Sequence, residues 1–241
     1  MAASRKKAKQ AAADAVVHMV EDGMTVGLGT GSTASLAIEA LGRRISRENL
    51  RVTGVPTSFA SERLAREYGI RLGTLDTHGR IDLAFDGADE CDPGLNLIKG
   101  RGAAHTREKI VAFSAARFIV LIDASKRVDL LGMHMPLPIE VVPMAVAPVM
   151  GCLRSLGARP ELRMGMKKDG PVVTDQGLWV IDAQFDEGIP DPAVVDRTLL
   201  DTPGVLDHGL FLEMATDVLV GLESGDIEHL RRDAAVIRRA D

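Results

Sequence analysis

The sequence has little cysteine and few aromatic residues. Its two cysteines, Cys91 and Cys152, form no CxxC pair, so they make neither a zinc site nor a disulfide framework. A reducing cytoplasm therefore suits the chain best. Only 3% of the residues are aromatic, but 46% are hydrophobic and 26% are charged, which is typical of a soluble globular protein and argues against disorder.

Signals for export, membrane insertion and nucleic-acid binding are also missing. The N-terminal stretch MAASRKKAKQAAADAV starts with basic residues but lacks the continuous apolar core of a secretory signal, and no apolar run approaches membrane-spanning length. The formal net charge of −5 attracts no nucleic acid, and the basic clusters at residues 5–9 and 231–239 are short. We expect a soluble, unexported protein that binds neither nucleic acid nor membrane.

Short apolar strands alternate with amphipathic helices along the first half of the chain, a pattern that predicts βαβ units and a parallel sheet. The expected strands are residues 24–28, 51–55, 70–74, 81–85 and 118–122, and the expected helices are residues 4–20, 32–44, 58–68 and 103–116. After residue 129, prolines and glycines punctuate short strands and one helix, which is typical of a smaller α+β domain. Compact strands return at residues 209–213 and 217–220 and could rejoin the first sheet. The expected fold class is α/β.

A glycine-rich loop, GLGTGSTA at residues 27–34, lies between the first expected strand and the next helix. Its glycines let backbone amides approach an anion, and the helix N-terminus adds a partial positive charge. Thr30, Ser32 and Thr33 supply hydroxyl donors, so a phosphate is the natural ligand. A tight turn capped by Ser32 or Thr33 is the structural alternative.

The same loop also satisfies the relaxed dinucleotide fingerprint GxGxxA, so a nicotinamide cofactor competes with a simple phosphate. The second expected strand, however, ends in GVPTS and offers no acid to bind a ribose. The loop also lacks the GK[ST] sequence of a P-loop. These two absences favour a phosphate that is not part of a dinucleotide.

The segment DGADECDPGLNLIKGRGAAHTRE, at residues 86–108, concentrates chemistry. Asp86 and Asp89 follow an apolar run and should emerge at the carboxyl end of a strand, where ligands bind in open α/β sheets. Together with Lys99 and Glu108, they suit proton transfer beside a sugar carbonyl, because a carboxylate can abstract the proton and a cation can stabilise the oxyanion. Taken singly, the acids could be turn, cap or surface residues and Lys99 could be solvated.

These motifs also occur together, in order and spacing, in a known family. They are GTGSTA at residues 29–34, DGADE at 86–90, LNLIKG at 95–100 and TREK at 106–109. Later landmarks are DASK at 123–126, PLPIEVVP at 136–143, VTDQG at 173–177 and GLF at 209–211. Over nearly its whole length, the chain resembles ribose-5-phosphate isomerase of the type A family.

The resemblance implies interconversion of ribose 5-phosphate and ribulose 5-phosphate through an enediolate, without a metal or an organic cofactor. Glu108 matches the proton acceptor, Asp86 and Asp89 match substrate-binding acids, and Lys99 matches the anion-stabilising segment. The implied substrate-binding positions are Thr30, Gly31, Ser32, Thr33, Asp86, Gly87, Ala88, Asp89, Lys99, Gly100, Arg101, Gly102 and Lys126. Lys9 is a further candidate for reaching the phosphate from the first helix.

The resemblance also implies a domain organisation and an assembly. A Rossmann-like, mostly parallel sheet domain would comprise residues 1–130 and 204–241, and a smaller α+β domain would be inserted at residues 131–203. The family's habit favours a homodimer or a tetramer.

Two positions depart from the family pattern. Arg101 replaces a glycine of the usual KGGG run, and it is strained if this position needs a positive φ. Otherwise its side chain points outward or adds a cation toward the substrate. His105 stands where an apolar residue is common and is either catalytic or a partly buried helix residue.

A non-catalytic sugar-phosphate-sensing domain is the alternative function, because related folds serve as effector domains of bacterial transcription regulators. Such a protein carries an N-terminal DNA-binding helix pair. Only about 23 residues precede the first expected strand, and the general-base position is occupied by Glu108. We therefore favour the enzyme.

Overall fold

In the computed structural model, which describes residues 2–232 and their side chains from Ser4 onward, contacts divide the chain into two units. Unit 1 comprises the segment up to Ala88, Arg107–Lys126 and the segment from Glu213 onward. Unit 2 comprises Asp89–Thr106 and Arg127–Leu212. The expected basic cluster at residues 231–239 lies, beyond residue 232, outside the described residues.

Unit 1 is built on a mostly parallel sheet, in which only β14 runs antiparallel to its neighbour. Every residue of the run FIVLID in β7 is buried, as expected for a strand covered on both faces. From one edge to the other, the described strands are β14 (Ile227–Arg231), β13 (Asp217–Gly221), β7 (Phe118–Asp123), β4 (Leu83–Gly87), β1 (Thr25–Leu28), β2 (Thr53–Pro56) and β3 (Arg71–Leu72). The expected α/β class is confirmed.

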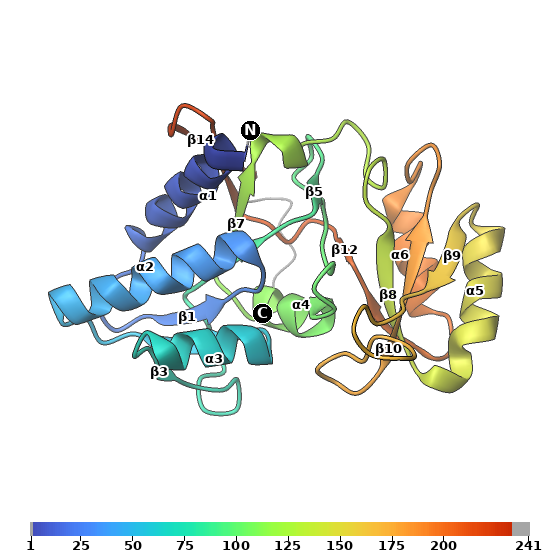
Figure 1. Cartoon of the computed structure of the whole chain (residues 1–241), viewed down its shortest axis with the longest axis horizontal. Helices are drawn as coiled ribbons and strands as arrows, with labels where there is room; N and C mark the ends of the chain where they lie inside the picture. Colours follow the sequence, from blue (N-terminus) through green and yellow to red (C-terminus); the bar gives the residue numbers. More distant parts are fainter. Residues whose placement is uncertain (1, 233–241) are drawn as a thin grey trace. The chain divides into compact units, whose positions relative to one another are not determined.

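Three helices of unit 1 pack on one another and on this sheet. They are α1 (Ala2–Val17), α2 (Ser32–Glu48) and α3 (Phe59–Glu67). Figure 1 shows α1 and α2 side by side. Helix α1 contacts β7 and β13, and α2 contacts β4 and β7. Their apolar faces meet those strands in one core that includes Val16, Ile38 and Leu121, all at most 1% exposed. A fourth helix, α4 (His105–Phe113), approaches β1 through Val111, where Gly27 leaves room.

The strand order puts a topological switch point between β1 and β4. The chain runs from β1 outward through β2 to β3 and then returns to β4 on the other side of β1. Because β1 and β4 are parallel, the loops that follow them leave from the same edge of the sheet. Ligands of open α/β sheets bind at such a point.

Unit 2 contains two antiparallel sheets. The larger one orders β11 (Val205–His208), β8 (Leu137–Val141), β10 (Trp179–Gln184) and β9 (Arg159–Leu162), and the smaller one orders β12 (Leu210–Phe211), β6 (Leu97–Ile98) and β5 (Glu90–Cys91). Helix α5 (Val146–Ser155) packs on β9 and β10 (Figure 1), and α6 (Pro192–Leu200) contacts β11. One apolar core joins both helices to these sheets.

Two expectations about the elements are wrong, and one strand was not predicted. The strand expected at residues 209–213 does not rejoin the parallel sheet, because β12 pairs antiparallel with β6 in unit 2. Within residues 130–203 there are two α-helices where we expected one. The second of them, α6, carries start signals, since the side chain of Asp191 accepts from the N–H groups of Ala193 and Val194 and Pro192 is its first residue. The edge strand β14 was not expected.

The boundaries of the two units differ from the boundaries of the expected domains. Residues 89–106 group with unit 2, because the short strands β5 and β6 pair with each other and with β12. The division into residues 1–130 with 204–241 and an insertion at 131–203 stays a prediction.

Candidate active site

The loop after β1 and the end of β4 meet at the switch point of unit 1. Asp86 Oδ1 accepts hydrogen bonds from the backbone N–H groups of Thr30, at 2.9 Å, and of Gly87, at 2.7 Å. A Cβ atom on Gly29 would lie 2.4 Å from both Asp86 Oδ1 and the carbonyl oxygen of Phe85, closer than such atoms can approach. Only glycine at position 29 lets the loop reach the carboxylate.

The side chain of Thr30 connects this loop to the end of β2. Its hydroxyl donates to Ser58 Oγ at 2.7 Å and lies 2.8 Å from Thr57 Oγ1. Ser58 is the N-cap of α3 and forms a reciprocal capping box with Ser61. Thr30 is among the predicted positions, but Thr57 and Ser58 are not, although a serine cap just before a helix is a recognisable signal.

The N-terminus of α2 has the properties of an anion site. Its N-cap, Gly31, has φ of 104° and no side chain with which to cap the helix. Ser32 is exposed there and Thr33 is buried. Lys9 Nζ, from α1, donates to Ser32 Oγ at 3.0 Å. The positive end of the helix, a hydroxyl and an ammonium group therefore converge at one place, as phosphate binding requires.

Glu108 lies in the first turn of α4 and is 4% exposed. Its alternative assignment to an exposed charged face is therefore wrong, and a buried carboxylate is uncommon unless it has a task or partners. Next to it, the guanidinium of Arg107 lies 5.3 Å from the ring centroid of Phe59, a cation–π contact between α4 and α3.

Lys126 follows β7, the neighbour of β4 in the parallel sheet. It ends the short 3-10 helix η1 (Ala124–Lys126) and is half-buried. The turn that precedes it is stabilised by Asp123, whose Oδ1 accepts from the N–H of Ser125 at 3.0 Å. Because β4 and β7 are parallel, Lys126 and Asp86 leave the sheet at the same edge.

In unit 2, the segment around Lys99 is tied down by its backbone. The N–H of Asp89 donates to the carbonyl of Ile98 at 2.8 Å, and the N–H of Lys99 donates to Gly209 O at 2.9 Å. Lys99 is 2% exposed, and its ammonium lies 5.4 Å from the ring centroid of Phe211. The solvated alternative for Lys99 is therefore wrong.

The loop that follows Lys99 shows why Arg101 is tolerated. The positive φ values fall on Gly100, at 104°, and Ala103, at 57°, and not on Arg101, so Arg101 is not strained. Its side chain is exposed, while its N–H donates to Asp89 Oδ2 at 3.0 Å. Arg163, which is not among the predicted positions, donates to the carbonyls of Gly100 and Arg101.

Buried polar residues lie in the segment that follows this loop, at the start of α4. His105, at 0% exposure, is a fully buried helix residue and not a partly buried one. Thr106 Oγ1 and Thr174 Oγ1 both donate to the carboxylate of Glu140, itself 1% exposed. Three motifs far apart in the sequence thus meet at one carboxylate in unit 2.

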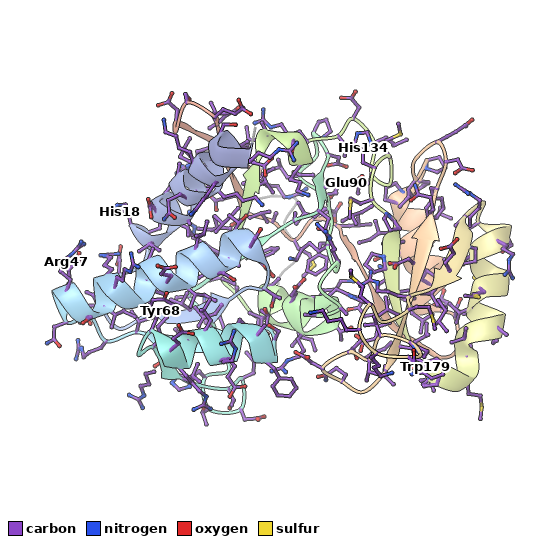
Figure 2. The ribbon with its side chains drawn as sticks, viewed as in Figure 1. His18, Arg47, Tyr68, Glu90, His134 and Trp179 are labelled. Carbon is purple, nitrogen blue, oxygen red and sulfur yellow. The ribbon has the colours of Figure 1, made fainter. Side chains whose placement is uncertain are left out.

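Glu90, the last acid of DGADE, has a structural task in unit 2. Its carboxylate accepts from the backbone N–H groups of Gly132, His134 and Met135 at 2.6, 2.7 and 2.8 Å. Figure 2 labels Glu90 and His134 beside each other. Glu90 therefore orders the segment that leads into β8.

The predicted positions fall into two groups, one in each unit. Unit 1 holds Thr30, Gly31, Ser32, Thr33, Asp86, Gly87, Ala88, Glu108 and Lys126, and unit 2 holds Asp89, Lys99, Gly100, Arg101 and Gly102.

Among residues 2–232, no cluster of three or more His, Cys, Asp or Glu side chains could hold a metal ion. None of the described helices combines the length and the apolar character needed to cross a membrane.

Comparisons with known proteins agree with these motifs. A family model described as ribose 5-phosphate isomerase A (phosphoriboisomerase A) matches residues 53–225. Ribose-5-phosphate isomerase A of Thermosynechococcus vestitus is 54% identical over 217 residues, which cover 90% of this chain and 92% of that protein.

Solved structures extend the similarity to the fold. Ribose 5-phosphate isomerase A from Methanocaldococcus jannaschii matches with a TM-score of 0.90 and 44% identity, covering 95% of this chain and 100% of its own. A D-ribose-5-phosphate isomerase in complex with phospho-erythronic acid also matches with a TM-score of 0.90, at 45% identity over 94% of this chain and 99% of its own. Since the family model, the sequence identity and the fold agree over most of its length, the chain belongs to the ribose 5-phosphate isomerase A family.

Proposed function

We propose that the chain interconverts D-ribose 5-phosphate and D-ribulose 5-phosphate, a step of the non-oxidative branch of the pentose phosphate pathway. The observation that carries the proposal is its similarity, over 94% of its length, to the isomerase solved with phospho-erythronic acid. The carboxylate of that ligand presents two oxygens at the end of a phosphorylated chain, much as an enediolate presents oxygens on carbons 1 and 2.

Glu108 is the proton carrier in this proposal. It removes the proton from carbon 2 of the open-chain aldose, and the electron pair of that bond forms the double bond of the enediolate while the carbonyl oxygen becomes an oxyanion. A proton then passes from oxygen 2 to oxygen 1, and Glu108 returns its proton to carbon 1. Substrate and product are isomers, so the step consumes no oxidant. The burial of Glu108 supports this role, because it shields the transferred proton from bulk water.

The other polar groups bind and stabilise the sugar. Asp86 is held by two backbone N–H groups through one oxygen, Oδ1. We assign Asp86 and Asp89 to opening the ring and orienting the hydroxyls, and Lys99 with Gly100, Arg101 and Gly102 to stabilising the oxyanion.

The phosphate is assigned to the loop of Thr30, Gly31, Ser32 and Thr33. Support comes from the N-terminus of α2, which begins at a glycine, and from the contact between Lys9 and Ser32. Because the Thr30 hydroxyl donates to Ser58 and its N–H donates to Asp86, we assign Thr30 to shaping the loop and Ser32 to contacting the phosphate through its side chain. Lys126 is assigned to a further contact with the substrate.

Cofactor-free turnover tests the function. Purified protein treated with a chelator is given ribose 5-phosphate, and formation of ribulose 5-phosphate is followed. We expect turnover with no added metal or nicotinamide. Binding of ribose 5-phosphate without turnover would instead support the sugar-phosphate-sensing domain.

We propose a homo-oligomer, a dimer or a tetramer, in the cytoplasm. Light scattering on the purified protein measures the first, and fractionation of cells that express it measures the second. A monomeric mass, or recovery outside the cytoplasm, would contradict these proposals.

A further inference from the structure

Arg163 bridges a strand of unit 2 and the loop that follows Lys99. It comes directly after β9, where its backbone N–H donates to Val180 O at 2.8 Å and its carbonyl accepts from Val172 at 2.8 Å. Its guanidinium donates through Nη1 to the carbonyls of Gly100, at 3.2 Å, and Arg101, at 3.0 Å. One planar guanidinium group thus holds two successive peptide groups of the loop.

Asp182, in β10, fixes the orientation of that guanidinium. Its two carboxylate oxygens accept from Arg163 Nε at 2.7 Å and from Nη2 at 2.5 Å. The side chains of Arg163 and Asp182 are only 17% and 23% exposed, so the pair is largely shielded from water. A forked pair with this geometry is directional as well as strong, and lysine cannot reproduce it.

Each carbonyl that Arg163 binds shares a peptide group with the N–H of the next residue. The peptide that carries Gly100 O also carries the Arg101 N–H, which donates to Asp89 Oδ2 at 3.0 Å. The peptide that carries Arg101 O also carries the Gly102 N–H. A cation on the carbonyl side polarises both peptides, which makes their N–H groups better donors.

We propose that Arg163, oriented by Asp182, is a positioning residue for the isomerisation. It sets the conformation of the Lys99–Gly102 segment and, through the Arg101 N–H, the orientation of the Asp89 carboxylate. This inference rests on the proposed function, which assigns Asp89 and the Lys99 segment to substrate binding and oxyanion stabilisation. The exposed side chain of Arg101 has no part in the connection, which explains how arginine is accepted there.

Steady-state kinetics of Arg163→Lys and Arg163→Met test the proposal. Neither variant can hold both carbonyls and Asp182 together, so we expect kcat to fall about 10- to 100-fold, the size of effect that a misplaced group produces. The change in KM should be much smaller. Asp182→Asn keeps the Arg163 guanidinium but weakens the contact that orients it. We therefore expect kcat to fall by a smaller factor than in the Arg163 variants.

Arg159 provides the matched control. It is the first residue of β9, the strand that Arg163 follows, and it pairs with Asp186, but the two side chains are 71% and 65% exposed. Arg159→Lys and Arg159→Met should therefore keep the kcat of the parent chain. Thermal unfolding of every variant shows whether the protein is folded at the assay temperature. If Arg163→Met is unfolded at the assay temperature, the comparison of kcat between Arg163→Lys and Arg159→Lys tests the proposal.

A double-mutant cycle separates positioning from a merely structural role. If Arg163 acts through the loop on Asp89, Arg163→Met combined with Asp89→Asn loses less kcat than the product of the two single losses. A loss equal to that product would overturn the proposal, and so would Arg163 variants as active as the Arg159 variants. Failure of the parent chain to isomerise ribose 5-phosphate would instead refute the proposed function, so the two failures are distinguishable.

Discussion

Glu108 and Gly29 show how single residues shape the site in unit 1. Glu108 is a carboxylate that lies 4% exposed in the first turn of a helix, where the helix dipole favours negative charge. Gly29 has no side chain, and for this reason the loop after β1 can lie against Asp86.

Glu108→Gln removes the base and keeps the shape of the side chain. Since general base catalysis contributes about 10²- to 10⁴-fold, we expect turnover to fall by at least that factor while affinity for inorganic phosphate is retained. Turnover of ribose 5-phosphate and phosphate binding by calorimetry measure the two effects. Near-normal turnover would rule out Glu108 as the proton carrier.

Gly29→Ala introduces a Cβ atom 2.4 Å from Asp86 Oδ1 and from Phe85 O. The loop and the carboxylate must separate, so we expect the free energy of unfolding to fall by about 1–3 kcal/mol. Turnover should fall as well. Urea unfolding and the isomerase assay measure the two quantities.

Gly151→Ala is the control for Gly29. Gly151 lies inside α5, and nothing stands within 4 Å of its added Cβ. Alanine should stabilise the helix there by about 0.5–1 kcal/mol, because glycine loses more backbone entropy on folding. A similar loss of stability in both variants would contradict the steric argument.

At the scale of elements, the buried carboxylate of Glu140 joins parts of unit 2 that are far apart in sequence. Glu140 comes from β8, Thr106 from the start of α4, and Thr174 from the segment between β9 and β10. The two hydrogen bonds therefore link these three segments through one side chain.

Thr106→Val keeps the shape of the side chain but removes one donor from Glu140. A buried charged group that loses a partner costs about 1–3 kcal/mol, so we expect a loss of that size in the free energy of unfolding. Thr198→Val is the control, because the Thr198 hydroxyl donates to a carbonyl of its own helix at an exposed position. Equal effects of the two variants, measured by urea unfolding, would show that the Glu140 contact has no special importance.

At the scale of the whole molecule, the acid limit of stability depends on buried carboxylates such as Asp217. Burial opposes ionisation of Asp217, but hydrogen bonds from Thr216, His229 and Arg117 outweigh it and lower its pKa below the ordinary value of 3.8. In the unfolded chain Asp217 binds a proton more readily. Its ionised form therefore stabilises the fold above about pH 4, and this stabilisation is lost as the pH falls through the lowered pKa.

Asp217→Asn should make the protein less stable near neutral pH and should flatten the decline of stability below about pH 4. The free energy of urea unfolding, measured from neutral to acid pH, checks both parts. Asp22, whose pKa is lowered to about 2 by Arg51, is the exposed counterpart. High salt should screen the Asp22 pair but not the Asp217 group. If the stability of Asp217→Asn declined below about pH 4 as steeply as that of the parent chain, Asp217 would not set the acid limit.

Much of the fold could be predicted because it depends on local patterns. The apolar run at residues 118–122 indicated a strand, and β7 is one, with every residue buried. The glycine loop lies between β1 and α2 as expected. Pairing partners could not be predicted in the same way, since β12 has only two residues and no pattern of its own. Its assignment to the first sheet was wrong for this reason.

The same distinction between local patterns and long-range contacts applies to the candidate site. By itself, the sequence determined the fold class, the family and the types of residue available for the chemistry, because strand patterns, glycine loops and motif spacing are properties of neighbouring residues. Only the tertiary structure decided that Glu108 is buried, that Arg101 escapes a positive φ and that Arg163 holds the Lys99 loop. The last contact joins residues 62 and 63 positions apart, and no local pattern carries such information.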